Sequence, residues 1–421
     1  MLPILLAAPQ DVAPIPLNPV RLLAPVQQRE ESELLRLAVE SIHPNPKPAQ
    51  GGRSRELIRE AEFAGDTATW YRAVSRYLAA LRDPNASADW PERVRTFREE
   101  QPTYLPFHVE LFGNRAVVTH VSAESGVQVG DELREIEGRR VGDIRTAIRR
   151  WTSGAIDLNQ YGPVLWGFRP NLRVRLKDAG ELTVRALTRP AWVALMTSAS
   201  PNPVNGGAQV TQLGSIGLDR LAVTPNRQIL DLRKGQGFVS AQLNQLTKTP
   251  PAWAAEIWKR PILIPERLKP LLSTTHALLE NPDPQSFTAR PDGTVALPAS
   301  AVAPPASSLE AFDGQLDVLV SPQTPIETVH LLARLRAVRP FRLIGELPSF
   351  TPGGYNGHSF WTLRLPHSGI TARIPAFRVE SGIKDHLRVD VLRRRTVEDA
   401  AGKTDSVLEW AKANPPVDSK A

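Results

Sequence analysis

The stretch LDVLVSPQTPIETVHLLARLRAVRPFRLI, residues 316–344, decides the fold class. It begins with a short apolar run, residues 316–320, which has the length and composition of a buried strand. Residues 326–338 have a helical pattern, and residues 341–344 form a second short strand. A strand, a helix and a strand in this order predict a right-handed crossover within a mostly parallel sheet. The fold class expected for this part of the chain, residues 205–412, is therefore α/β.

Other segments of this core agree with that fold class. Two further strands are predicted at residues 210–218 and 228–232, and helical pieces are predicted at residues 243–246 and 252–258. Residues 281–308 are rich in Pro, Ala and Ser, which is typical of a surface excursion.

Residues 29–100 are predicted to form a helical N-terminal domain. Residues 29–42 repeat apolar side chains at three- and four-residue steps, which makes one apolar helix face from Leu34, Leu35, Val39 and Ile42. The run His43-Pro-Asn-Pro46 ends this helix, and His43 is expected to be a helix-stop contact. Two more helices are predicted at about residues 54–64 and 67–82.

The two ends of the chain are predicted to lie outside the domains, as a leader at residues 1–28 and a tail at residues 413–421. Leu2 to Ala8 is a short apolar stretch that ends in small residues, like the back half of a secretory signal, but no charged region precedes it. Export to the periplasm, the cell envelope or the medium, and an ordinary apolar N-terminus of a cytoplasmic protein, are both kept open. Frequent Pro, Ala and Arg indicate the coding bias of a GC-rich bacterial genome.

Residues 101–190 have the pattern of a small β domain. Residues 107–112 and 116–121 alternate like half-buried strands. They are followed by Gly126-Val-Gln-Val-Gly-Asp-Glu-Leu-Arg-Glu-Ile-Glu-Gly138, in which Gly130 and Asp131 begin a strand and Gly138 closes a tight turn. This run resembles the corresponding run of PDZ domains. The resemblance implies a PDZ-like domain, and a generic small β domain is the alternative.

The composition excludes several classes of protein. Hydrophobic residues make up 41% and charged residues 23% of the 421 positions, close to the globular norm, which argues against a disordered or fibrous chain. No apolar run approaches the ~20 residues of a transmembrane helix. Cysteine is absent, which excludes disulfides, a thiol nucleophile and Cys-ligated zinc. The net charge of +7 comes from scattered basic residues without interleaved aromatics, so no nucleic-acid partner is expected.

Four separated segments resemble the motifs of one enzyme family. They are Leu230-Asp-Leu-Arg-Lys-Gly-Gln-Gly237; Ile344-Gly-Glu346 with Leu365-Pro-His-Ser-Gly-Ile370; Val389-Asp-Val391 with Thr396, Glu398, Asp399, Gly402, Asp405, Leu408 and Glu409; and His43-Pro-Asn-Pro46. In this order and spacing they are similar to the tail-specific, or C-terminal-processing, serine peptidases, whose core also occurs in tricorn protease. The resemblance implies three parts: an N-terminal helical domain, a PDZ-like domain, and an α/β peptidase-like core with a mostly parallel sheet.

The resemblance also locates the two catalytic positions. In this family a serine hydroxyl attacks the peptide carbonyl while a neighbouring base takes its proton. Matching Thr324 to the family threonine places Ile326 at the serine position, and isoleucine has no nucleophilic atom. One branch uses a histidine as the base, and Asn85 occupies that position; another uses a lysine, and residues 347–361 contain none. Asparagine cannot accept and return a proton at neutral pH, so both catalytic roles are expected to be lost.

The resemblance implies that the oxyanion hole is partly retained. The family's glycines after the Leu-Asp-Leu-Arg run present backbone N–H groups to the developing oxyanion. Gly235 and Gly237 occupy these places, and Phe238 replaces the last glycine. Asp231 and Arg233 are expected to be charge-paired residues at a strand end, with a role in the fold.

Other candidates for chemistry are kept as alternatives. Ser321, Thr324 and Thr328 flank the lost serine position, so a displaced hydroxyl nucleophile is one alternative. His358 and His367 fall near the pocket that the resemblance predicts, although an unpaired loop histidine is usually a surface residue. No cluster of His, Asp and Glu has metal-ligand spacing, and neither a metal nor another cofactor is expected.

The leading functional hypothesis is a peptide- or protein-binding pseudopeptidase. The PDZ-like domain would take an extended peptide or a protein C-terminus as an added strand, with Leu105, Phe107 and Val109 in the groove wall. Alternatively, these three side chains fill the core of that domain. Tyr104 to Phe107 occupy the place of the carboxylate-binding loop but lack its glycines. The other functions kept open are an active serine-type endopeptidase with a displaced nucleophile, and a structural envelope protein. The oligomeric state is left open.

Overall fold

The computed structural model places most of the predicted helices and strands. The residues that it describes are 22–63, 65–152, 158–198, 210–212, 219–224, 227–233, 256–258, 264–274, 288–289, 295–297, 314–338, 340–348, 355–356, 360–379, 387–402 and 404–415. The helical piece predicted at residues 243–246 lies outside them, as does the leader up to residue 21.

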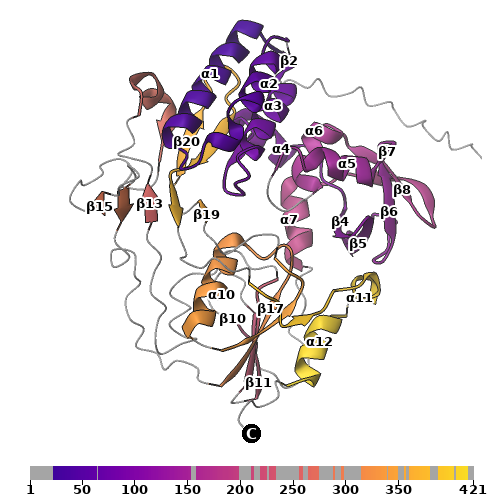
Figure 1. Cartoon of the computed structure of the whole chain (residues 1–421). Helices are drawn as coiled ribbons and strands as arrows, with labels where there is room; N and C mark the ends of the chain where they lie inside the picture. Colours follow the sequence, from indigo (N-terminus) through magenta and orange to yellow (C-terminus); the bar gives the residue numbers. More distant parts are fainter. Residues whose placement is uncertain are drawn as a thin grey trace, which may run out of the picture.

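A six-stranded sheet forms the lower half of the molecule in Figure 1. Its strands, in spatial order, are β10 (Val210–Gln212), β11 (Asp219–Thr224), β12 (Arg227–Asp231), β17 (Gln315–Val320), β18 (Arg342–Gly345) and β23 (Val391–Leu392). The last four of these run parallel to one another. Strand β11 runs antiparallel to both of its neighbours, β10 and β12. Helix α10 (Ile326–Val338) connects β17 to β18. The mostly parallel α/β core predicted from residues 316–344 is therefore confirmed.

One glycine is required where β17 and β18 lie side by side. Gly345 has a φ of +130°, and a Cβ atom built on it would lie 2.0 Å from the carbonyl oxygen of Val320. Any side chain at residue 345 would therefore force the two strands apart. The Ile-Gly-Glu motif thus serves the sheet itself.

A buried ion cluster joins three strands of this sheet to the last helix. Asp317 on β17 is fully buried and accepts hydrogen bonds from Arg227 on β12 at 2.8 Å and from Arg342 on β18 at 2.8 and 3.0 Å. The two arginines also donate to the carbonyl groups at the C-terminal end of α12 (Ser406–Ala413), among them those of Ala411 and Asn414. This end of the helix has a partial negative charge, which the guanidinium groups neutralise. The cluster therefore fixes α12 on the sheet.

The N-terminal helices share their hydrophobic core with strands from much later in the chain. The helices are α1 (Pro25–Ile42), α2 (Gly52–Glu60), α3 (Thr67–Ala79) and α4 (Glu92–Glu100). They are accompanied by a four-stranded sheet with the order β14 (Leu272–Ser273), β20 (Phe360–Arg364), β21 (Thr371–Pro375) and β3 (Ser87–Asp89). Buried side chains of both groups form one cluster. The sequence analysis placed β20 and β21 in a separate domain, because nothing local marks this association.

Residues 101–190 contain a β-sheet packed against a short helix. The sheet has the order β4 (Phe107–Phe112), β5 (Arg115–Val121), β6 (Glu132–Ile136), β8 (Asn171–Leu176) and β9 (Gly180–Arg185), with β7 (Arg139–Arg140) paired to β6. Helix α5 (Val141–Ile148) contributes Ile144 and Ile148 to its core. We call this part the 101–190 module. Its assignment as a PDZ domain stays a prediction.

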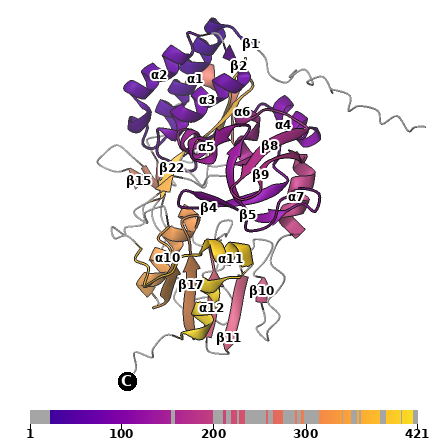
Figure 2. The ribbon, with the colours of Figure 1, turned by 90° about the vertical axis from the view of Figure 1, so that its right-hand side faces the viewer.

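The 101–190 module packs closely on α11 (Val397–Gly402), near the C-terminus of the chain. A Cβ atom built on Gly130 would lie 2.8 Å from the Cβ of Ala401, so only glycine fits there without a shift. Arg395, just before α11, forms an ion pair with Glu110 of β4. Figures 1 and 2 both place α11 beside β5. These contacts hold the module against the α/β core.

One predicted helical piece is partly wrong. Residues 252–258 were expected to be helical, but Glu256–Trp258 is strand β13. It pairs on one side with β16 (Val295–Leu297) and on the other with β22 (Phe377–Val379). Backbone hydrogen bonds to two strands distant in sequence outweigh a weak local preference. Strand β16 lies within residues 281–308, which were expected to be a surface excursion.

None of the helices in the described ranges is both long and apolar enough to cross a membrane.

Candidate functional site

The predicted nucleophile position lies at the first residue of α10, directly after the turn that follows β17. Ile326 is 9% exposed and belongs to the same buried cluster as Leu81, Ala86 and Trp361. This cluster is the shared core of the N-terminal helices and the sheet that contains β20. The isoleucine side chain therefore fills the junction between α10 and the N-terminal helices, where a catalytic serine would need a reachable hydroxyl group.

The hydroxyl groups of Ser321 and Thr324, in the turn before Ile326, contact backbone groups. The Oγ1 of Thr324 donates to the carbonyl oxygen of Leu232 at 3.2 Å and accepts from the N–H of Ser321 at 2.9 Å. The Oγ of Ser321 donates to the carbonyl oxygen of Arg233 at 2.8 Å. Both residues thus fasten the β17–α10 turn to the end of β12. A carbonyl oxygen does not take a proton at neutral pH, so neither hydroxyl has a general base in these contacts.

The predicted base position lies in a loop that a buried histidine holds in place. Asn85 donates its backbone N–H to Asp83 at 2.9 Å, and Asp83 contacts the Nε2 of His43 at 2.9 Å. The Nδ1 of His43 accepts from the backbone N–H of Asn45 at 3.1 Å. A ring nitrogen that accepts carries no hydrogen, so the hydrogen of the neutral ring is on Nε2 and is donated to Asp83. His43 is therefore a structural contact at the helix end, as predicted.

One predicted catalytic position and the neighbour of the other belong to the same large buried cluster. They are Ile326 and Ala86, the residue next to Asn85. The Asn85 side chain can donate and accept hydrogen bonds there, but it cannot carry a proton between reacting groups. Gly235 and Gly237, which were predicted to form the oxyanion hole, lie outside the described residues, and so does His358.

Arg233 links two of the family motifs. Its guanidinium group donates to both carboxylate oxygens of Asp231 and to both carboxylate oxygens of Asp405. Asp405 also accepts from the N–H of Leu408 and caps α12. Asp231 and Arg233 therefore form the charge pair that was predicted, and they join the strand-end motif to the closing motif. Neither residue is required for chemistry by this geometry.

The pKa values of this network reflect its hydrogen bonds. Burial lowers the pKa of Arg233, but the hydrogen bonds and charges of Asp231 and Asp405 outweigh burial and raise it. Burial raises the pKa of Asp405, but the Arg233 guanidinium outweighs burial and lowers it. Burial likewise raises the pKa of Asp399, but hydrogen bonds from Ser406 and from Thr396 lower it further than burial raises it. The carboxylates of Asp405 and Asp399 are therefore held in the charged form.

These lowered pKa values predict that the protein loses stability in acid. A carboxylate whose pKa is lower in the folded state stabilises the fold above its unfolded pKa, and this contribution disappears as the pH falls through its folded pKa. We expect the free energy of unfolding to decrease once the pH is below about 4, because carboxylates of the unfolded chain take up protons there. Urea unfolding at a series of pH values measures this. The variant Asp405→Asn should have a lower free energy of unfolding at neutral pH, and this free energy should change less as the pH is lowered. If the variant and the wild type lost the same stability in acid, the lowered pKa of Asp405 would be contradicted.

A buried glutamate that the sequence analysis missed fixes another family motif. Glu31 on α1 is fully buried and accepts hydrogen bonds from the indole N–H of Trp70 at 2.6 Å and from the backbone N–H groups of His367 and Ser368 at 2.7 and 2.6 Å. His367 itself pairs with Glu30 at the surface, 2.8 Å away. The signal was present in the sequence, because Glu31 lies one turn before Leu34 and Leu35 on the apolar face of α1.

The three predicted peptide-binding side chains lie in or against the core of the 101–190 module. Leu105 and Phe107 are fully buried, and Val109 is partly buried beside the same cluster. The backbone N–H of Leu105 donates to the side chain of Asn159 at 2.8 Å, a contact that the sequence analysis also missed. Their role in a groove wall stays a prediction. Among the described residues, no group of three or more His, Cys, Asp or Glu side chains could hold a metal ion.

The structure matches solved structures of CPAF over most of its length. A CPAF mutant matches with a TM-score of 0.59 and 13% identity, covering 92% of this chain and 97% of that chain. Mature CPAF complexed with lactacystin matches with a TM-score of 0.55 and 13% identity, covering 92% and 97%. The photosystem II D1 C-terminal processing protease is a looser match, with a TM-score of 0.42, 14% identity and coverage of 87% and 93%. No protein-family model matches the chain, and no curated protein sequence matches it. The chain thus has a tail-specific serine peptidase-like fold, as the motifs implied.

Proposed function

We propose that this peptidase-like protein binds extended polypeptide segments without cleaving them. The observation that supports the absence of cleavage is Ile326, an apolar side chain packed into a core at the family's nucleophile position. Asn85 at the base position supports it independently. The fold has a parallel sheet and a helix start of the kind on which such enzymes place a serine, and the residues predicted at the two catalytic positions, Ile326 and Asn85, carry neither a hydroxyl nor a base.

The backbone of Val109 on β4 supports the binding part of the proposal. Among the described strands, β4 pairs with β5 alone. Val109 lies opposite Val118, whose N–H and C=O groups bond to Asp131 and Gly130 on the other side of β5. Opposite residues of an antiparallel pair exchange both hydrogen bonds or neither, so the backbone groups of Val109 face away from β5. An extended peptide could add a strand at this edge.

The hydrogen bonds before β4 favour an internal segment over a free C-terminus as the bound partner. A terminal carboxylate is captured by several unpaired backbone N–H groups. Here the N–H groups of Thr103 and Tyr104 both donate to the carbonyl oxygen of Leu187, and that of Leu105 donates to Asn159. Pro106 has no N–H group. The binding mode that remains is strand addition along β4.

The test measures peptide binding by the full chain after a substitution that removes one backbone N–H group, that of Val109, from the edge of β4. The probe is a library of extended peptides, and the readout is affinity together with the melting temperature. Proline is tolerated at an edge position whose N–H faces away from the ladder. We expect Val109→Pro to lose peptide binding, and Val109→Ala, which trims the side chain but keeps the N–H, to retain most of it.

Two outcomes would contradict the binding proposal. Equal affinity of Val109→Pro and wild type, at unchanged melting temperature, would show that the β4 edge is not used. No binding of any peptide by the intact wild-type chain would favour the structural envelope protein instead. Cleavage of a bound peptide would favour the active endopeptidase.

A further inference from the structure

Helix α5 of the 101–190 module carries two arginines on one side, Arg145 within the helix and Arg149 at its C-cap. Val141, Ile144 and Ile148 of this helix face the core of the module. Each arginine follows one of the two isoleucines, so the arginines lie together on one flank of the buried face, four residues apart. Arg149 is exposed and Arg145 is half-buried. We call this pair the arginine flank of α5.

The arginine flank lacks the acidic partners that other arginines of the module have. The ion pairs elsewhere in the module join Arg115 and Arg134 to Glu132, Arg169 and Arg173 to Glu137, and Arg175 to Glu135. Among the described residues, no ion pair includes Arg145 or Arg149. Asp143 is two positions before Arg145 and therefore lies on another side of the helix. The positive charge of the flank is thus not neutralised by a described carboxylate.

The arginine flank reaches the end of strand β4. The guanidinium group of Arg145 donates to the carbonyl oxygen of Gly113, which directly follows β4. A peptide strand added at the edge of β4 would lie about 4.8 Å from it. An arginine side chain has five N–H donors, and the contact with Gly113 uses one of them. The end of an added strand beside Phe112 is therefore within reach of this guanidinium group.

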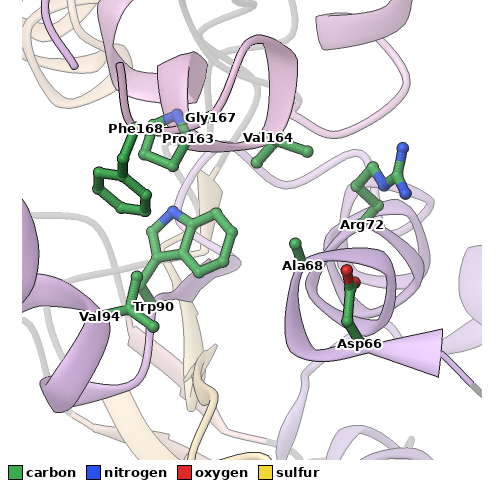
Figure 3. A pocket seen from close by; sticks show the side chains of 9 residues that line it. All are labelled: Asp66, Ala68, Arg72, Trp90, Val94, Pro163, Val164, Gly167 and Phe168. Carbon is green, nitrogen blue, oxygen red and sulfur yellow. The ribbon is translucent and has the colours of Figure 1, made fainter. Parts of the chain in front are cut away.

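The rest of the chain covers other surfaces of the module. Figure 3 shows Pro163 and Phe168 of the module on one side of a cavity of about 220 Å³ and Ala68 of α3 on another, with Trp90 between them. The lining of this cavity is mostly apolar and includes no residue of α5. On another surface, α11 lies beside β5. In the described part of the chain Arg149 stays exposed, so the arginine flank is accessible to a partner.

We propose that the arginine flank of α5 selects acidic segments among the extended peptides that bind at β4. The inference rests on the proposed strand addition at β4 and adds the chemical class of the ligand. This ligand is an extended peptide with glutamate or aspartate side chains near the end of the added strand that lies beside Phe112. The partner is a polypeptide because the flank adjoins a strand edge, which a peptide backbone can extend.

The chemistry of a carboxylate complements the arginine flank. A planar guanidinium group holds a carboxylate through two parallel N–H···O bonds. Like charges four residues apart on a helix repel each other, and a carboxylate bound between them removes this repulsion. Burial and, to a smaller extent, the charge of Arg149 lower the pKa of Arg145, in agreement with a flank that lacks an opposing charge. The net charge of +7 also attracts acidic segments from a distance.

The test compares two ten-residue peptides in binding to the full chain. Both have the same centre of alternating threonine and valine, and they carry either glutamates or glutamines on both sides of it. Fluorescence anisotropy at low salt measures the two affinities. We expect the glutamate peptide to bind about two- to thirtyfold more tightly, the range expected for two exposed ion pairs. The difference should shrink at about 1 M salt, where the Debye length is about 3 Å.

Three variants assign the preference to the flank. Arg145→Gln with Arg149→Gln should bind the two peptides with equal affinity. The matched control, Arg173→Gln with Arg175→Gln, removes the same charge from exposed pairs on β8 and should keep the preference for glutamate. Arg149→Glu leaves the contact of Arg145 with Gly113 in place and should make the glutamine peptide the tighter ligand.

Four results would overturn the proposal, and they separate it from strand addition at β4. Equal binding of both peptides by the wild type would leave strand addition intact and remove the acidic preference. A preference that persists in the double variant of Arg145 and Arg149 would assign it to other residues. Binding of neither peptide would overturn strand addition as well. Binding of phosphatidylserine vesicles that is lost in the double variant, without any preference between the peptides, would make the flank a membrane contact.

Discussion

Replacement of Asp317 by alanine is expected to lower the free energy of unfolding by about 3–5 kcal/mol, the usual cost of removing one partner of a buried ion cluster. Asp317 is fully buried and is the carboxylate partner of both Arg227 and Arg342. Without it, two guanidinium groups stay close together in the core without an opposing charge. The same arginines bind the C-terminal carbonyl groups of α12, so this helix should loosen from the sheet first. Urea unfolding followed by circular dichroism measures the loss.

The matched control for this prediction is an exposed pair on the same helix. Glu409 pairs with Lys412 at 2.8 Å, and the Glu409 side chain is exposed. Such surface pairs contribute about 0–1 kcal/mol, so Glu409→Ala should change stability little. If Asp317→Ala were no more harmful than Glu409→Ala, the ion cluster would not be what fixes α12.

Repair of the two predicted catalytic positions should produce the largest change in activity. Ile326→Ser restores a hydroxyl, but without a base it should hydrolyse peptides poorly. Adding Asn85→His should raise the rate about 10²–10⁴-fold above that of the single variant, the usual contribution of a general base. The assay uses an unfolded protein substrate, well below the melting temperature, because loss of the buried isoleucine also costs stability.

The control for the repair is Ile326→Ala, which creates a similar cavity without a hydroxyl group. It should remain inactive with or without Asn85→His. Equal activity of Ile326→Ser and the double variant would show that Asn85 is not at the base position. Activity of Ile326→Ala would point to another nucleophile.

Much of the α/β core could be predicted because its elements follow from local pattern. The predicted helix at residues 326–338 has the bounds of α10, and the strand predicted at residues 107–112 has the bounds of β4. Strand β13 could not be predicted, since its pairing partners β16 and β22 come much later in the chain. The shared core of α1 and β20 could not be predicted for the same reason, because contacts between residues hundreds of positions apart leave no local signature.

The sequence predicts the candidate site only where a motif marks it. Neighbouring motif residues assign Ile326 and Asn85 to the two catalytic positions, and this assignment stays a prediction. Asp83 and Asn159 were missed, because the groups that they bind lie 40 and 54 positions away. Glu31 was missed although its place on the apolar face of α1 indicated burial, because its partners at residues 367 and 368 lie far away in the sequence. A buried polar residue is recognised from its partners, and partners are known only once the chain is folded.

The residues that resemble the family motifs have roles in the fold. Gly345 allows two strands to lie together, Arg233 joins Asp231 to Asp405, and Glu31 holds the turn at residues 365–370. Thr396 and Asp399 exchange hydrogen bonds at the start of α11. None of these contacts requires a catalytic serine. These motif residues therefore indicate the fold and do not by themselves indicate catalysis.

The most direct test of this account is covalent labelling by a fluorophosphonate, a reagent that attaches to activated hydroxyl groups, followed by mass spectrometry of the intact protein. An active serine peptidase treated in parallel shows that the reagent works. We expect the wild-type chain to gain no mass, because Ile326 offers no hydroxyl and the hydroxyls of Ser321 and Thr324 donate to backbone carbonyl groups. The addition of one label per chain, lost in Ser321→Ala or Thr324→Ala while the fold persists, would contradict the account and establish a displaced nucleophile.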